Sequence, residues 1–71
     1  MTPTQFREAR KSLGLTQPKM ANMMGFSRVG SVSEIERGLT AVTLMADRLI
    51  RAYLSGYRPD DWPAEQNKNG S

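Results

Sequence analysis

The 71-residue chain contains no cysteine and no histidine, and each absence removes a class of chemistry. Without cysteine, disulfides and thiolate-bound zinc are excluded. Without histidine, the chain lacks the commonest general base and the commonest metal ligand of proteins. The acidic residues are scattered, so they form no nucleophile–base pair or metal site that the sequence can reveal. We therefore expect a protein that is not an enzyme and that uses no metal or cofactor.

Long hydrophobic runs are also missing. No segment approaches the roughly 20 apolar residues that a membrane-spanning helix requires, and the N-terminal residues do not resemble an apolar signal segment. We expect a cytoplasmic protein of a bacterial host cell, without a membrane partner. A chain of this length forms a single domain near the lower size limit of a stable core, so oligomerisation would reinforce it.

The charge is unevenly distributed along the chain. Residues 1–58 contain nine basic and four acidic side chains, whereas residues 59–71 contain one basic and three acidic side chains. The net charge of +3 therefore combines a basic body with an acidic end. A basic body is compatible with a phosphate-bearing partner such as nucleic acid. We place the domain at residues 1–58 and a partly disordered tail at residues 59–71.

Capping residues and apolar spacing predict an all-α protein. Thr2 and Gln5 form a capping box around Pro3, so a first helix should cover residues 3–12. A second, short helix should follow Thr16 and end at Gly25. Its expected buried side consists of Met20, Ala21, Met23 and Met24.

Two further helices are predicted in the second half of the chain. Val32 and Ile35 form a narrow apolar seam in a segment that stops at Gly38. A last helix should begin after Thr43 and end before Gly56. Its expected apolar face consists of Leu44, Leu49, Ile50, Tyr53 and Leu54. The methionines are expected in the core rather than in a ligand groove, Met45 included, so no small-molecule ligand is expected.

Several anchors of the central segment match one family in order. They are Leu15-Thr16-Gln17, Met20-Ala21, Gly25-Phe26-Ser27 and Val32-Ser33-Glu34-Ile35-Glu36-Arg37-Gly38. This pattern resembles the Cro/CI-type (XRE-like) helix-turn-helix DNA-binding family of phage and bacterial regulators, with Ile35 where the family usually has Trp or Leu. The resemblance covers about residues 3–54. It implies a compact four- to five-helix lambda-repressor-like domain whose recognition helix lies between Ser27 and Arg37.

The spacing from Gly25 to Gly38 departs from this pattern. It is one residue longer than the family's commonest spacing, so the extra residue lies between Ser27 and Val32. Counting forward from Gly25 places the cap of the third helix on Ser27, whereas counting back from the apolar seam places it on Arg28.

A third start of this helix is also open. The stretch from Ser31 to Glu34 offers another capping box. Gly30 favours a late start, because glycine costs about 1 kcal/mol in a helix interior. The sequence leaves all three starts open.

The resemblance implies that the first turn and a half of the recognition helix contacts base edges. The candidates are Arg28, Val29, Gly30, Ser31, Ser33 and Glu34. Arg28 either makes two hydrogen bonds to a guanine, or contacts a phosphate, or is solvated. Glu34 either accepts from a cytosine amino group or pairs with Arg37. The two serines are donors or helix caps, and Val29 contacts a thymine methyl or packs in the fold.

Phosphate contacts are expected beside this helix. The candidates are Gln17, Lys19, Ser27 and Arg37. Gln17 stands where the family places a phosphate-binding amide, at the start of the second helix. Glu36 is expected to brace the fold, because a carboxylate near phosphates would repel them.

The expected function is a sequence-specific transcriptional regulator that binds double-stranded DNA as a homodimer. A (auto)repressor of a phage or mobile-element operon, Cro-like or anti-CRISPR-associated, fits the small size best. The alternative is an antitoxin-like or adaptor module that uses the same fold to bind protein. In the tail, Tyr57 and Trp62 either pack on the domain or form a dimer contact, and residues 66–71 are expected to be disordered.

Overall fold

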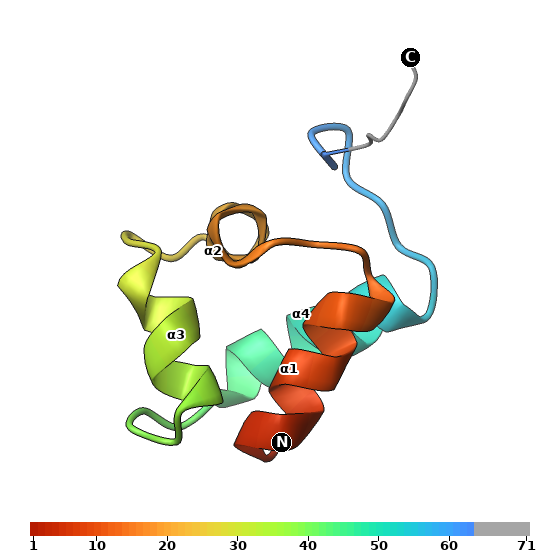
Figure 1. Cartoon of the computed structure of the whole chain (residues 1–71). Helices are drawn as coiled ribbons and strands as arrows, with labels where there is room; N and C mark the ends of the chain where they lie inside the picture. Colours follow the sequence, from red (N-terminus) through yellow and green to blue (C-terminus); the bar gives the residue numbers. More distant parts are fainter. Residues whose placement is uncertain (64–71) are drawn as a thin grey trace.

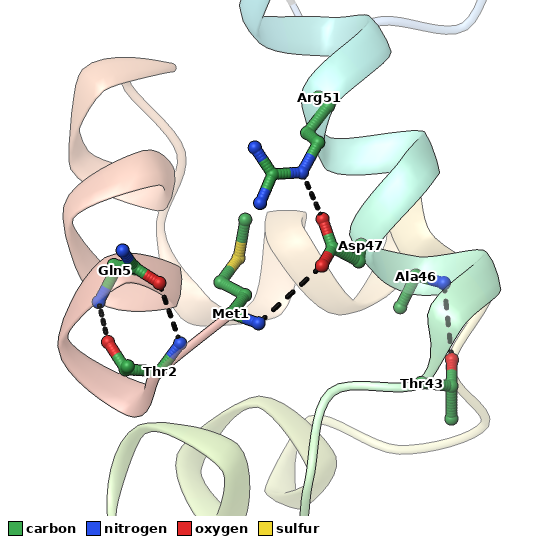
Figure 2. Close-up of polar contacts among 7 residues, drawn as sticks. All are labelled: Met1, Thr2, Gln5, Thr43, Ala46, Asp47 and Arg51. Atoms are coloured by element: carbon green, nitrogen blue, oxygen red, sulfur yellow. Dashed lines mark hydrogen bonds and ion pairs between the residues drawn. The ribbon is translucent and has the colours of Figure 1, made fainter.

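Three threonines define where helices begin. Thr2, Thr16 and Thr43 each have extended backbone, and each accepts a hydrogen bond from a backbone N–H three residues later. These bonds pair one of the N–H groups that a helix start leaves without an intrahelical partner. Figure 2 shows two of the caps: Thr2 and Gln5 cap each other reciprocally, and Thr43 accepts from the backbone of Ala46 at 3.1 Å.

The computed structural model describes residues 1–63, which form four α-helices and no strand. The helices are α1 (Pro3–Ser12), α2 (Gln17–Met24), α3 (Gly30–Glu36) and α4 (Leu44–Leu54). The predicted all-α class is confirmed, and the first, second and fourth helices begin after the predicted caps. Within the described residues, no helix has the length and apolar character needed to cross a bilayer.

The four helices are held together by four main contacts. α3 packs against both α1 and α2, and α4 packs against the same two helices. In Figure 1, α2 is seen end-on and α3 side-on, so these two helices cross steeply. One edge of the molecule is therefore formed by α3, with the start of α2 and α1 beside it.

The core forms where the inner faces of the four helices meet. Each helix contributes one of the largest fully buried side chains, namely Phe6, Met20, Val32 and Ile50. Burial of a side chain of this size contributes about 1.5–3 kcal/mol. The Tyr53 hydroxyl donates to the backbone oxygen of Met23 at 2.8 Å and ties α4 to the end of α2. The predicted seam of Val32 and Ile35 is buried, as expected.

Three residues that we expected in the core lie on the surface. Met45 is 83% exposed, and Leu44 and Leu54 are also exposed. The reason is the register of α4: its inner face is formed by Ala46, Ile50 and Tyr53. This spacing turns the flanking apolar residues away from the other helices.

The segment after α4 folds back on the domain. The ring of Trp62 meets Tyr53 edge-on at 5.0 Å, and the Arg58 guanidinium lies 4.3 Å from the Trp62 ring centre. Arg58 also donates to the backbone oxygens of Tyr53 and Tyr57, at 2.7 and 2.8 Å. Of the two roles expected for Trp62, the structure shows packing on the domain. The expected disorder of residues 66–71 lies outside the described residues.

Asp47, in the first turn of α4, forms two ion pairs (Figure 2). Its carboxylate accepts from Arg51 and lies 3.5 Å from the amino group of Met1. The hydrogen bond from Arg51 is the main cause that lowers the pKa of Asp47 below its ordinary 3.8, against a smaller opposing effect of burial. Because the pKa is lower in the folded than in the unfolded chain, ionised Asp47 stabilises the fold above about pH 4, and this stabilisation is lost as the pH falls through the folded pKa.

We therefore expect Asp47→Asn to lower the melting temperature at neutral pH, and the difference from the wild type to shrink toward about pH 2 as Asp47 becomes protonated. Thermal unfolding followed by circular dichroism at both pH values measures this. Asp60→Asn, at an exposed carboxylate after α4, is the control and should have little effect at either pH. An equal deficit of Asp47→Asn at both pH values would contradict the role of the charge.

Candidate functional site

The buried side of α3 determines which of its residues face outward. Val32 and Ile35 lie in the core, and helical periodicity then turns the opposite side of α3 away from it. The residues on that opposite side are Gly30, Ser33, Glu34 and Arg37. All four are among the contacts predicted from the sequence, so the structure brings them together on one face.

α3 begins without a side-chain cap. Val29 occupies the N-cap position with helical backbone angles, φ −63° and ψ −34°, and no side chain accepts a hydrogen bond there. The first turn is closed instead by short-range backbone bonds, from Ser31 to Arg28 at 3.2 Å and from Val32 to Val29 at 3.0 Å. Such bonds, three residues apart, are typical of a tight 3₁₀ turn. The caps predicted at Ser27, Arg28 and Ser31 are therefore all wrong.

The side chain of Arg28 crosses this first turn and pairs with Glu34. Its Nη2 donates to both carboxylate oxygens at 2.9 Å. The two side chains are 59% and 33% exposed, so this is a surface ion pair. It replaces the predicted alternative of a pair between Glu34 and Arg37, and it engages the glutamate that a capping box with Ser31 would have used.

A shallow hollow lies between α1, the start of α2 and the outer side of α3. Its volume is about 290 Å³, and its lining residues are Arg7, Arg10, Gln17, Ser33, Glu36 and Arg37. The structure thus brings together three predicted contacts, Gln17, Ser33 and Arg37. Sequence reasoning missed Arg7 and Arg10. Their spacing of three residues places both on one side of the first helix, which is the signal that could have found them.

Glu36 forms the polar floor of this hollow. Nε and Nη2 of Arg10 donate to its two oxygens at 2.6 and 3.2 Å, and the Gln17 amide donates at 3.2 Å. Arg10 also donates through Nη1 to the backbone oxygen of Leu15 at 3.0 Å. The ion pair is nearly buried, with 13% of Arg10 and 7% of Glu36 exposed. The prediction that Glu36 braces the fold is confirmed, because it joins α1, α2 and α3.

The positive charges around the hollow are not all neutralised. Glu36 balances Arg10, whereas no side-chain hydrogen bond or ion pair engages Arg7, Lys19 or Arg37 within residues 1–63. Lys19 is exposed in the first turn of α2, outside the lining of the hollow. Ser27 and Val29 are likewise exposed, in the loop before α3. The hollow is therefore a cationic surface with a rigid floor.

No protein-family model, no curated protein and no solved structure matches the chain. The function is therefore inferred from the arrangement of these residues.

The two glutamates of α3 should respond differently to the same substitution. Glu36→Gln leaves the nearly buried Arg10 without its charge partner, and we expect a loss of about 3 kcal/mol in the free energy of unfolding. Glu34→Gln breaks an exposed pair and should cost less than about 1 kcal/mol. Urea denaturation of both variants measures the difference. Equal losses would show that the network around Glu36 does not anchor the fold.

Proposed function

We propose that this protein is a sequence-specific DNA-binding regulator with a lambda-repressor-like helix-turn-helix, formed by α2 and α3. The observation that carries the proposal is the outer side of α3, which adjoins a hollow whose Arg7 and Arg37 have no ion-pair partner among residues 1–63. An α-helix fits the DNA major groove, which is about 12 Å wide. With α3 in the groove, the hollow beside it would meet the phosphate backbone.

Phosphate contacts are assigned to the hollow and its surroundings. Arg7 and Arg37 supply charge, and Gln17 supplies a second amide N–H besides the one that Glu36 accepts. Gln17 is also the first residue of α2, where its own backbone N–H and the helix dipole favour an anion, whereas Pro18 has no N–H and that of Lys19 donates to Thr16. Lys19, exposed in the first turn of α2, and Ser27, exposed in the loop before α3, are further candidates for phosphate contacts. Such contacts fix the position of the protein on DNA and carry no sequence information.

Base contacts are assigned to the start and the outer side of α3. Ser33 and Glu34 project from the helix, and Gly30 lets the backbone come close to the base edges. Arg28 and Val29 extend from the preceding loop toward guanine and a thymine methyl group, respectively. Ser31, on the flank of the helix, is the remaining donor to a base. Each well-formed two-point contact contributes about 1–3 kcal/mol of discrimination between bases.

A homodimer bound to a palindromic operator completes the proposal, with (auto)repression of a phage or mobile-element operon as its role. One small domain makes few phosphate contacts, and two half-sites about one DNA turn apart multiply affinity. The loop after α3 and the first turn of α4 expose Leu39, Leu44 and Met45. A twofold contact there would place the two copies of α3 near each other. This is the opposite end of α4 from the segment around Trp62, for which the sequence left a dimer contact open.

The DNA-binding proposal is tested by selecting duplexes from a randomised library and measuring affinity for the selected duplex over a salt series. Arg37→Ala should weaken binding and reduce the slope of log K against log salt by about one ion. Arg48→Ala removes the same charge from the exposed side of α4 and should leave both values nearly unchanged. If no sequence is enriched, or if both variants lose affinity equally, sequence-specific binding through this surface is wrong. Absence of any duplex binding would favour the protein-interaction alternative.

The dimer contact is tested by comparing Met45→Glu with Tyr57→Glu. Both replace an exposed apolar side chain by a charge, Met45 in the first turn of α4 and Tyr57 three residues after its end. Sedimentation equilibrium should show that Met45→Glu shifts the protein to monomer, because a carboxylate loses hydration in an apolar contact. Tyr57→Glu should leave the wild-type dimer intact. The reverse pattern would place the contact near the tail.

A further inference from the structure

We propose that Glu34 and Gly30 hold Arg28 away from DNA until a correctly placed guanine competes for it, which lowers the affinity for non-specific DNA. This inference rests on the proposed function. It assigns Glu34 a second role besides direct base contact: the carboxylate is an intramolecular competitor for the arginine that reads guanine.

The donor geometry of Arg28 shows how Glu34 competes with a base for it. A guanidinium offers two pairs of parallel donors, Nε with Nη2 and Nη1 with Nη2, and a two-point contact with O6 and N7 of guanine uses one of these pairs. Nη2 belongs to both pairs, and it is the atom that donates to both oxygens of Glu34. The carboxylate of Glu34 therefore competes with a guanine for the atom that either two-point contact uses.

The pair between Arg28 and Glu34 also affects binding to DNA of the wrong sequence. Non-specific affinity for DNA comes almost entirely from neutralised phosphates, so each free cation on the surface increases it. Paired with Glu34, the charge of Arg28 is largely cancelled. On a wrong sequence Arg28 gains only a phosphate contact by leaving, whereas on the right sequence it gains two hydrogen bonds to guanine. The pair therefore keeps Arg28 off wrong sequences and lowers affinity for them, and the right complex loses the energy of the pair because the exchange breaks it.

Gly30 leaves the space that the Arg28 guanidinium occupies. The φ angle of Gly30 is not positive, so its backbone conformation does not require glycine. A Cβ at position 30 would lie 2.4 Å from Nη1 of Arg28 and 3.6 Å from its Cζ, with no other atom close by. The missing side chain thus provides the path by which Arg28 reaches Glu34. A methyl group there would displace only the end of a flexible side chain, and alanine favours the helix over glycine.

The test measures affinity for the selected duplex and for a duplex of scrambled sequence with the same length. Glu34→Gln should increase affinity for the scrambled duplex by about two- to fivefold, which is the range for an exposed ion pair. Gly30→Ala should act in the same direction although it removes no charge. Its melting temperature should equal or exceed that of the wild type, which separates this effect from misfolding.

A double-mutant cycle separates release of Arg28 from mere loss of a negative charge. In an Arg28→Ala background, Glu34→Gln should give a clearly smaller gain on the scrambled duplex, because no arginine remains to be released. An equal gain in both backgrounds, or no effect of Gly30→Ala, would overturn the inference and leave the proposed function intact. If selection enriches no duplex at all, the proposed function and this inference both fail.

Discussion

The arrangement of this protein depends on one nearly buried carboxylate. Glu36 at the end of α3 accepts from Arg10 of α1 and from Gln17 of α2, so a single group joins three helices. A charge with so little exposure persists only where its partners replace the lost water, and three hydrogen bonds do so here. Apolar burial is non-directional, whereas these bonds fix the orientation of the helices that they join. The cationic hollow is built on the same residues, so its shape and the stability of the fold have a common source.

The two glutamates of α3 show how position decides the role of a side chain. Glu34 and Glu36 are two residues apart, and a helix turns such positions to different sides. Glu36 turns toward α1 and α2, where its arginine has little access to solvent. Glu34 turns outward, and its arginine remains largely in solvent. An exposed pair of this kind is weak enough to be exchanged for another partner, whereas the pair around Glu36 is part of the fold.

The sequence predicted the helix starts that local capping residues control. The first, second and fourth helices begin as expected, because a threonine within the same few residues caps each one. The start of α3 was missed, because its first turn is closed by backbone bonds and Glu34 pairs with Arg28 across it. The exposed position of Met45 was missed because apolar spacing alone fits more than one register of α4. The spacing of Arg7 and Arg10 places both on one side of the first helix, but only the packing of α1 beside α3 brings them to the hollow.

The two ends of α3 are held to different degrees, and this difference has a consequence for recognition. A helix of seven residues is unstable alone, so its position comes from the residues that bind it to its neighbours. The end at Glu36 is fixed by a nearly buried network, whereas the start at Gly30 has no side-chain cap. The start is therefore the part that adjusts with the smallest loss of stability. In the proposed DNA complex, a rigid end beside the cationic hollow and an adaptable start beside Arg28 would allow docking on the DNA backbone first and base readout second.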